Sequence, residues 1–335
     1  MQEQVVAALL NPDTYDEAPG RIQLVQTHIS FIFLTKNYAY KVKKAVDLGF
    51  LDFTTLEKRR YFCDQELELN RRLCREMYLE VVPITRSKSI KMKGEGEIVE
   101  YAVKMVKMPH KRLMNKLLQA NQVDKKLIDR LARIISGFHS KAETNRMISE
   151  FGSISTLKSN WEENFEQTQE FVSRTISSGC FNLIHERIED FFKKNKRFFE
   201  NRVKEARIRD CHGDIHSGNI FVTEKIYIFD AIEFNHRFRY SDVVSDVAFL
   251  AMDLDFKGRI DLSEYFINRY IMYSQDPQLT RLLPFYKCYR AYVRGKVISF
   301  KIKDSNISRV EKITALKEAR EYFKLAFKYT EALRT

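Results

Sequence analysis

The sequence predicts an α+β fold, as one unit of two lobes or as two domains, in which a strand-rich N-terminal part precedes a mainly helical C-terminal part. The first observation is length, because 335 residues and 39.7 kDa exceed what one small core needs. The second is composition: 44% hydrophobic and 13% aromatic residues supply enough apolar surface for a large core, which excludes a disordered chain. The third is a change of pattern near Pro109, where strand-like segments give way to helical periodicity.

The first hundred residues predict the order strand, strand, helix, strand, strand. Residues 21–46 (RIQLVQTHISFIFLTKNYAYKVKKAV) are rich in β-branched and aromatic residues, and Lys36-Asn37 marks a turn between two strands. Residues 51–79 have apolar residues at near-helical spacings and predict one long helix, with Thr54 or Thr55 as its cap. Residues 81–108 predict two strands joined across Gly94-Glu95-Gly96.

Beyond Pro109, helical patterns cover residues 124–140 and 156–176. One segment interrupts them, residues 209–234 (RDCHGDIHSGNIFVTEKIYIFDAIEF). Here a polar loop is followed by IFV, a turn at residues 223–225 and IYIF, which together predict a short hairpin. Polar residues lie at both ends of that hairpin, where chemistry is often placed.

Composition also limits the cellular location and the binding partners that we expect for the protein. No window approaches the roughly 18–20 apolar residues of a membrane span, and the N-terminal residues lack a signal-peptide pattern, so we expect a cytoplasmic protein with no membrane partner. The five cysteines include no CxxC pair, which indicates reduced thiols. The net charge is +12, and residues 193–209 carry eight basic against two acidic groups. Such a run indicates a solvated helix face or an anionic partner, nucleic acid included, and we favour the solvated face.

Three side chains of the polar segment carry the predicted chemistry. Asn219 follows Asp214 by five positions, and Asp230 follows Asn219 by eleven. Phosphoryl transfer needs a carboxylate that orients a hydroxyl group and oxygen ligands that hold Mg²⁺ on the nucleotide phosphates. We expect Asp214 to be the catalytic carboxylate, and Asn219 and Asp230 to be the metal ligands.

A cation for the phosphates is expected from the strand that contains Tyr38-Ala39-Tyr40-Lys41, which has the apolar-Ala-apolar-Lys form of the third kinase strand. Lys41 would contact the phosphates, and Glu66 on the predicted helix would form an ion pair with it. Lys43 lies on the same strand face as Lys41, so it remains the alternative lysine.

These motifs resemble the aminoglycoside phosphotransferase-like branch of the protein-kinase-like superfamily. The residues His212-Gly213-Asp214-x-His216-x-Gly218-Asn219 match its catalytic loop, and residues 228–233 (IFDAIE) match its metal-binding segment. The resemblance implies a bilobal kinase-like fold, with an antiparallel sheet and one main helix in an N-lobe at residues 1–107, and a mainly helical C-lobe at residues 108–335. It also implies a hinge that binds adenine through the backbone of Met105, Val106, Lys107 and Met108.

The sequence is still more similar to uncharacterised bacterial phosphotransferase-like proteins, some fused to a P-loop kinase domain, through YKVKK, LGFLDF, ELELNRRL and YRAYVRGKV. One departure from the superfamily is the segment before Lys41, THISFIFLTKN, which has no GxGxxG motif. The absence of this motif weakens the predicted binding of the nucleotide phosphates.

Further residues are expected to support the site or to contact substrate. Asp246 lies in an apolar helical stretch, and we expect it to accept backbone N–H bonds from the catalytic loop, since a buried Asp must be hydrogen-bonded. We expect His212 to be structural. The candidate substrate contacts are His216, Glu233, Arg290 and Arg294; a solvated loop is the alternative for His216, and a solvated helix face is the alternative for the two arginines.

The function we expect is an ATP- and Mg²⁺-dependent kinase acting on a hydroxyl group of a small molecule, with GTP as an alternative nucleotide. A +12 protein is a poor electrostatic match for a polycationic aminoglycoside, so a sugar, amino alcohol or anionic metabolite is favoured. Two alternatives stay open. One is a catalytically weak kinase-fold binding or regulatory protein whose basic helices bind nucleic acid or an acidic partner. The other is a kinase with a macromolecular acceptor.

Overall fold

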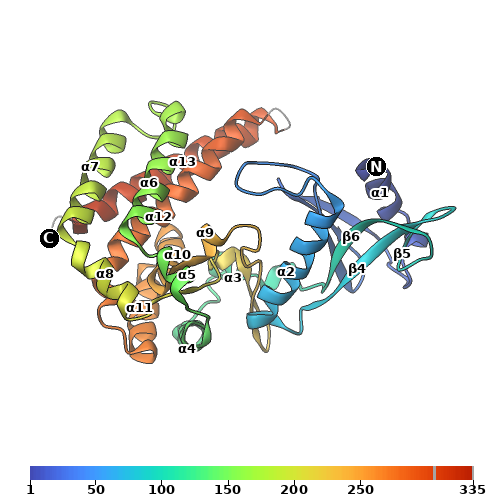
Figure 1. Ribbon diagram of the computed structural model, residues 1–335, viewed down its shortest axis with the longest axis horizontal. Coiled ribbons are helices and arrows are strands. Elements are labelled where there is room, and N and C mark those ends of the chain that lie inside the picture. Colours follow the sequence, from blue (N-terminus) through green and yellow to red (C-terminus); the bar gives the residue numbers. More distant parts are fainter. Residues whose placement is uncertain (305–306, 334–335) are drawn as a thin grey trace. The chain divides into compact units, whose positions relative to one another are not determined.

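The computed structural model describes residues 1–304 and 307–333 and has an α+β architecture, as the sequence predicts (Figure 1). Contacts between Cα atoms divide it into two compact units: unit 1 comprises residues 1–120 and 218–239, and unit 2 comprises residues 121–217 and 240–335. The lobe boundary at residues 107/108 stays a prediction. Within the described ranges, no helix is both long and apolar enough to cross a membrane.

Unit 1 is built on a six-stranded sheet with the order β1-β2-β3-β6-β4-β5, in which every neighbouring pair is antiparallel. Its strands are β1 (Gln23–Gln26), β2 (Ser30–Leu34), β3 (Tyr38–Lys43), β4 (Tyr78–Arg86), β5 (Ile90–Met92) and β6 (Glu97–Val106). The other elements of the unit are α1 (Gln2–Leu9), α2 (Leu56–Cys74), α3 (Met114–Gln119), the hairpin strands β8 (Ile220–Val222) and β9 (Ile226–Ile228), and α9 (His236–Arg239).

The two faces of the sheet have separate cores because side chains alternate along each strand. On one face, Tyr40 and Val42 of β3 pack with residues of α1. On the other face, Ala39 packs with Cys63 and Cys74 of α2. Lys41 and Lys43 share the face of Ala39, so the period of two directs both lysines toward α2.

Two predicted elements of unit 1 need correction. The predicted first strand is broken into β1 and β2, because the Thr27 hydroxyl accepts hydrogen bonds from the backbone N–H groups of Ile29 and Ser30 and so closes a turn. The second correction concerns β4. The chain turns after Arg86 and forms β5, a short strand paired with β4 that the sequence analysis did not predict. The long helix is confirmed as α2, with the hydroxyl of Thr55 as its cap, and the hairpin across residues 223–225 is confirmed as β8–β9.

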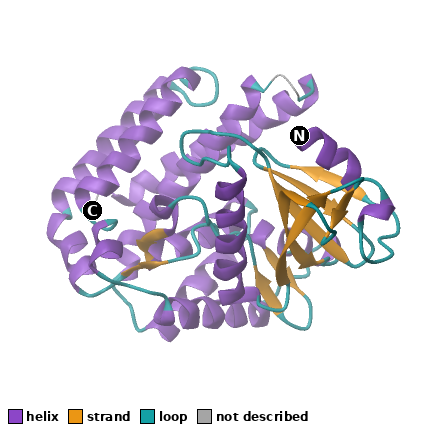
Figure 2. Cartoon of the chain, turned by 45° about the vertical axis from the view of Figure 1, so that its right-hand side comes forward, coloured by secondary structure: helices purple, strands orange, loops and turns teal. Residues whose placement is uncertain are grey.

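Unit 2 is mainly helical and holds one short antiparallel pair of strands, β7 (Ile208–Asp210) and β10 (Tyr240–Asp242), which Figure 2 shows in orange. Its helices are α4 (Lys125–Lys141), α5 (Arg146–Glu150), α6 (Ile154–Thr168), α7 (Ser178–Lys194), α8 (Lys196–Lys204), α10 (Val243–Phe256), α11 (Ile260–Ser274), α12 (Leu279–Phe300) and α13 (Arg309–Thr330). Helix α10 packs against α11 and α12, and α4 packs against α11. Gly295 permits the close approach of α12 and α13, since a Cβ there would lie 3.1 Å from the Phe323 ring.

The buried Arg202 links α8 to two other segments of unit 2, which contain Asp242 and Asp276. Arg202 is completely buried, and its guanidinium donates hydrogen bonds of 2.7–2.8 Å to the carboxylates of Asp242 and Asp276. Asp242 also caps α10 by accepting the backbone N–H of Val244. One guanidinium therefore neutralises two buried carboxylates and links α8, α10 and the end of α11.

We predict that Arg202→Met lowers the free energy of unfolding by about 3–5 kcal/mol, because two buried carboxylates lose their counter-ion. Urea unfolding monitored by circular dichroism measures the change. The matched control is Arg197→Met, which removes an exposed arginine of the same helix and should change stability by less than about 0.5 kcal/mol. Equal stabilities of the two variants would contradict the assignment.

Candidate active site

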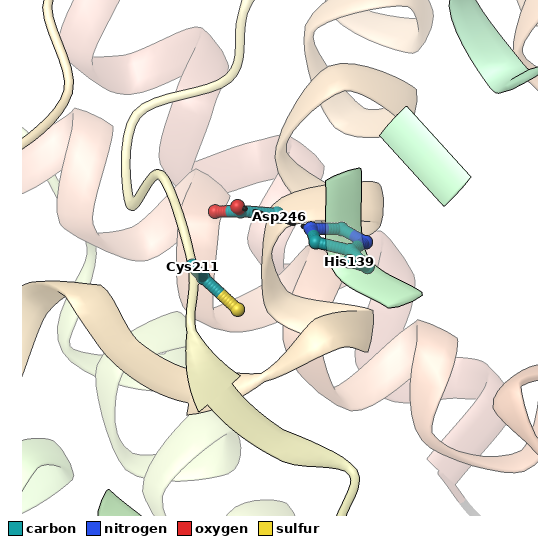
Figure 3. Close-up of side chains that lie close together, drawn as sticks. All are labelled: His139, Cys211 and Asp246. Carbon is teal, nitrogen blue, oxygen red and sulfur yellow. Dashed lines mark hydrogen bonds and ion pairs between the residues drawn. The ribbon is translucent and has the colours of Figure 1, made fainter. Parts of the chain in front are cut away.

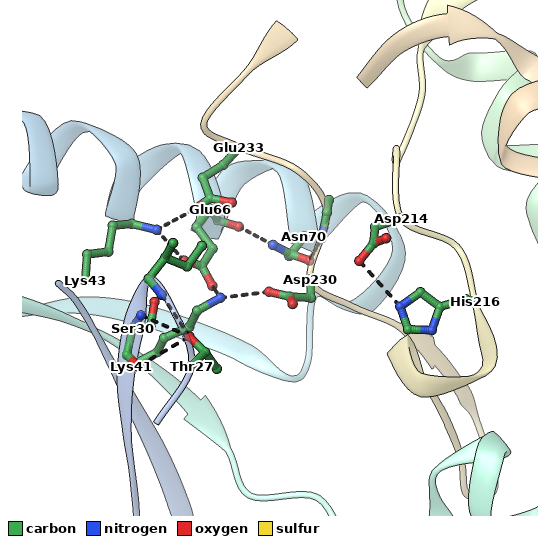
Figure 4. Close-up of polar contacts among 12 residues, drawn as sticks. Thr27, Ser30, Lys41, Lys43, Glu66, Asn70, Asp214, His216, Asp230 and Glu233 are labelled. Carbon is green, nitrogen blue, oxygen red and sulfur yellow. Dashed lines mark hydrogen bonds and ion pairs between the residues drawn. The ribbon is translucent and has the colours of Figure 1, made fainter. Parts of the chain in front are cut away.

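Two lysines of β3 share one buried carboxylate of α2 (Figure 4). The Nζ atom of Lys41 lies 2.8 Å from Oε1 of Glu66, and the Nζ atom of Lys43 donates to Oε2 at 2.7 Å. Glu66 is completely buried. Burial alone would raise the pKa of Glu66, but the two lysines lower it, so the carboxylate is ionised at neutral pH. The predicted ion pair between Lys41 and Glu66 is thus present, and Lys43 shares it.

Lys41 differs from Lys43 in its second partner. Its Nζ donates to Oδ1 of Asp230 at 2.7 Å, whereas Nζ of Lys43 contacts the carboxylate of Glu233. Burial would lower the pKa of Lys41, but the neighbouring carboxylates raise it well above its ordinary value. Lys41 therefore carries a positive charge beside the carboxylate that the sequence predicts to be a metal ligand.

Asp230 follows β9 in a strained backbone conformation, with φ = 64°. A non-glycine residue in this region costs about 1–3 kcal/mol and is often found at functional sites. The turn is held from α2: the Asn70 side chain accepts the backbone N–H of Ala231 at 2.9 Å and donates to the Glu66 carbonyl at 2.8 Å. Asn70 is buried, and the sequence analysis missed it, although a polar residue four positions after Glu66 on the same helix face is the pattern that would have indicated it.

The hairpin places Asn219 and Asp230 at the same end. Ile220 pairs with Ile228, and the backbone N–H of Phe229 donates to the carbonyl of Asn219 at 3.0 Å, so the two predicted ligands flank the paired strands. The Asp230 side chain is 44% exposed, and within the described ranges only its Oδ1 atom has a partner. The available carboxylate oxygen and the Asn219 amide are hard oxygen donors of the kind that Mg²⁺ prefers. The side chains present fit a magnesium site.

Glu233 is buried and paired with Lys43, so its position differs from that expected of a substrate contact. Burial raises the pKa of Glu233, and the Lys43 ammonium opposes that rise. The pair joins the segment after Asp230 to β3. We therefore assign Glu233 to the support of Glu66 and Lys43.

In unit 2, Asp214 faces a histidine and an arginine. Nε2 of His216 lies 3.5 Å from Oδ2 of Asp214 (Figure 4). The His216 ring packs on Phe249. Burial alone would raise the pKa of Asp214, but His216 and Arg294 lower it to about 2. Asp214 is therefore an ionised hydrogen-bond acceptor at neutral pH. The packing of His216 against Phe249 favours an ordered residue over a solvated loop.

Asp246 supports the backbone of the same loop. Its carboxylate accepts the backbone N–H groups of His212 at 2.8 Å and Gly213 at 2.9 Å, which are the hydrogen bonds that the sequence analysis predicts. Gly213 has φ = 86°, a conformation that strains other residues, which explains the glycine at this position. His212 is buried, and its Nδ1 accepts the Asp214 N–H at 3.3 Å, in line with the expected structural role.

Arg290 is buried and also binds this loop. Its guanidinium donates to the carbonyl of Gly213 at 3.0 Å and to the hydroxyl of Ser245 at 3.1 Å. This arrangement differs from both interpretations of the sequence, a solvated face and a substrate pocket, because the helix packs this side chain inward. Arg294 lies near Asp214 and the Tyr322 ring, so it remains a candidate substrate contact.

The ring of His139 completes the support of Asp246 (Figure 3). Its Nε2 lies 3.3 Å from Asp246, and its Nδ1 is 2.7 Å from the Tyr270 hydroxyl. Cys211 is also near, and the three side chains could in principle hold a metal ion. However, burial raises the pKa of the Cys211 thiol well above its ordinary value, and Asp246 already accepts two backbone N–H groups. The cluster is therefore better explained as structural.

The predicted hinge residues are all in unit 1. Met105 and Val106 end β6, and Met105 is buried. The backbone N–H of Val106 donates to Met77, and that of Lys107 donates to Asn37. These two N–H groups are therefore used within the fold, so the predicted adenine contacts would have to come from other backbone groups of residues 105–108.

Comparisons with known proteins support the fold. The chain is similar to a crystal structure of a choline/ethanolamine kinase family protein from Mesorhizobium loti, with 9% identity, a TM-score of 0.53 and coverage of 99% of both chains. It is similar to a candidate aminoglycoside phosphotransferase from Ralstonia eutropha JMP134, with 12% identity, a TM-score of 0.54 and coverage of 99% of this chain and 98% of that one. Plasmodium vivax ethanolamine kinase matches with 14% identity and a TM-score of 0.50 over 91% of this chain and 81% of that one. The chain thus has the protein-kinase-like fold that the resemblance implies.

Sequence comparison finds uncharacterised bacterial relatives. Uncharacterised proteins of Mycobacterium tuberculosis and Mycobacterium bovis are 32% identical over 277 residues, which is 82% of this chain. The match spans 54% of each mycobacterial protein, so this chain corresponds to about half of their length. No protein-family model matches the sequence.

We predict that Asp214 stays ionised in the folded protein far below its ordinary pKa of 3.8, with a midpoint of about 2. Because the pKa is lowered on folding, the ionised group stabilises the folded state above pH 3.8, and this contribution is lost as the pH falls toward 2. Carbon-13 NMR of the labelled carboxyl group measures the titration.

The variants His216→Asn and Arg294→Gln should each raise this midpoint toward 3.8, because each removes a positive neighbour of the carboxylate. The control Arg197→Gln removes an exposed arginine of α8 and should leave it unchanged. A wild-type midpoint at or above 3.8 would refute the assignment.

Proposed function

We propose that the protein is a phosphotransferase that uses ATP or GTP with Mg²⁺ and transfers the terminal phosphoryl group to a hydroxyl group of a small molecule. The observation that carries the proposal is the position of Lys41, whose ammonium lies between the carboxylates of Glu66 and Asp230. This pattern of one buried carboxylate and one half-exposed carboxylate around a lysine suits the binding of a nucleotide–metal complex. The fold shared with small-molecule kinases supports it.

Each residue has a proposed role. Lys41, anchored by Glu66, neutralises the charge of the nucleotide phosphates, and Met105, Val106, Lys107 and Met108 form the adenine hinge. Asn219 and Asp230 would hold Mg²⁺, which when bound supplies charge neutralisation on the phosphate oxygens. Lys43 and Glu233 hold Glu66 and the segment after Asp230 in place.

The low pKa of Asp214 determines what it does in the reaction. A carboxylate with a pKa of about 2 is a weak base, so it accepts a hydrogen bond from the acceptor hydroxyl and orients the oxygen. The phosphorus–oxygen bond to the nucleoside diphosphate breaks, a bond to the substrate oxygen forms, and the hydroxyl proton leaves through Asp214 to solvent. Catalysis then derives from positioning and electrostatic stabilisation.

The acceptor is proposed to be a sugar, an amino alcohol or an anionic metabolite. The net charge of +12 disfavours a polycation, and Arg294 beside Asp214 adds a local positive charge. His216 and Arg294 are the proposed substrate contacts. The cytoplasmic location, and the alternatives of a regulatory protein that binds nucleic acid or an acidic partner and of a kinase with a macromolecular acceptor, stay predictions from the sequence.

Magnesium should be required for nucleotide binding. We expect ATP or GTP to raise the melting temperature of the purified protein when Mg²⁺ is present and to raise it far less without the metal. Asp230→Ala should abolish the metal-dependent part, because it removes an oxygen ligand. If neither nucleotide stabilises the protein at millimolar concentration, the proposal is wrong, and salt-sensitive nucleic-acid binding that survives Asp214→Asn would favour the alternative.

Substitutions of the two lysines of β3 should have different effects on nucleotide binding and on stability. Lys41→Met is expected to remove the stabilisation by nucleotide, because this ammonium contacts Asp230. Lys43→Met is expected mainly to lower the melting temperature, because it leaves the buried Glu233 without its cation. Thermal denaturation with and without Mg²⁺–ATP measures both. The reverse pattern would make Lys43 the phosphate-binding lysine.

A further inference from the structure

Unit 2 contains a cavity that the proposed reaction does not use. It has a volume of about 360 Å³ and is lined by residues of α4, β7, the loop just before β7, α11 and the start of α10. This volume lies in the range of small-molecule pockets. All of its lining residues belong to unit 2.

The lining of the cavity is strongly cationic. It includes Arg133, Arg207 and Arg209, and its lining residues include no aspartate or glutamate. Three carboxylates lie just outside the lining: an Asp129 oxygen is 3.9 Å from Arg133, and oxygens of Asp276 and Glu205 are 3.8 and 3.9 Å from Arg207, all beyond hydrogen-bond distance. Arg209 donates to the carbonyl of Ala142 at 2.8 Å, a neutral partner. Thus, within the described ranges, none of the three guanidinium groups donates a hydrogen bond to a carboxylate, and the buried Nε of Arg207 has no hydrogen-bond partner, so donors remain for a ligand.

Hydroxyl groups complete the lining, and that of Tyr273 already donates to the Asp129 carboxylate at 2.9 Å. The Tyr273 hydroxyl accepts a hydrogen bond from Arg133 at 2.9 Å, which holds that guanidinium at the cavity. The Ser274 hydroxyl oxygen is buried, and it has no hydrogen-bond partner among the residues that the structure describes. A buried hydroxyl without a partner is costly, so a ligand that supplies an acceptor would be stabilised here.

We propose that this cavity binds a small anion that carries a phosphate group. Guanidinium groups match the planar edges of phosphate oxygens and form paired, charge-assisted hydrogen bonds with them. A phosphate also brings enough acceptor atoms to satisfy several guanidinium donors and the Ser274 hydroxyl at once. The binding itself does not depend on the proposed kinase reaction.

The cavity is connected to the Asp214 loop through two of its lining residues. His139 and Tyr270 line the cavity and are hydrogen-bonded to each other, and His139 also contacts Asp246. Asp246 in turn holds the backbone of His212 and Gly213. An anion that orders the cavity lining therefore also orders this loop, and a resulting effect on catalysis would rest on the proposed function.

Isothermal titration calorimetry tests the site with three probes: inorganic phosphate, pyrophosphate and glycerol 3-phosphate. Sodium chloride keeps the ionic strength constant, since screening weakens exposed charge pairs. We expect at least one probe to bind the wild-type protein and to bind Arg207→Gln/Arg209→Gln at least tenfold more weakly. Preference for glycerol 3-phosphate would identify a phosphate monoester as the ligand class, and preference for inorganic phosphate or pyrophosphate would identify a free phosphate.

Two controls separate this site from other sites. Arg197→Gln removes an exposed arginine of α8 and should retain full affinity, and Asp230→Ala should also retain it, because the proposed metal site is not involved. If the double variant does not fold, Arg133→Gln replaces it: that side chain is 70% exposed, and its loss should weaken binding at least threefold.

Hydrogen exchange gives the second readout. Bound anion should slow exchange at the amides of His212 and Gly213 in the wild-type protein, and not in the cavity variants. The proposal is overturned if no probe binds, if the cavity variants bind as well as the wild type, or if Asp230→Ala alone abolishes binding.

Discussion

Unit 1 depends on the burial of one carboxylate between two ammonium groups. An ion without a counter-ion in such an environment costs several kcal/mol, and Glu66 is paired with both Lys41 and Lys43. These two ion pairs join β3 to α2. The second partners of the lysines, Asp230 and Glu233, extend this network to the segment after β9. The network thus positions the residues proposed to bind nucleotide and metal, independently of any bound ligand.

In unit 2, backbone N–H groups stabilise a buried carboxylate, that of Asp246. Asp246 lies in a helix that is buried along most of its length, and it is tolerated there because two backbone N–H groups and His139 satisfy its oxygens. The same hydrogen bonds hold the loop that carries Asp214. Support of the loop and stability of the helix therefore depend on the same contacts. This coupling is also why the cavity beside His139 is connected to that loop.

The fold is shared at 9–14% identity with structures of small-molecule kinases, which shows how little of the sequence specifies it. What the fold requires is an alternation of side chains along six strands, one amphipathic helix on the sheet and a set of buried helices. What the chemistry requires is a few polar groups at the ends of elements. Many sequences meet the requirements of the fold. The chemistry requires particular residues, and the motifs contain these residues.

The sequence by itself predicted the α+β class, the long helix with a cap at Thr54 or Thr55, the β8–β9 hairpin and an ion pair between Glu66 and Lys41, with Lys43 as the alternative lysine, because local periodicity and short motifs indicate them. Only the tertiary structure decided which groups meet across long separations in the chain. Asn70 supports the turn at Ala231, Arg290 binds the Gly213 carbonyl, and arginines from α4, β7 and the loop before β7 line one cavity. The split of the first strand by the Thr27 hydroxyl belongs here too, since one side-chain hydrogen bond overrides a β-rich composition. Periodicity in the sequence indicates which face of a helix or strand a residue occupies. Which side chain it contacts on that face depends on how elements far apart in the chain pack together.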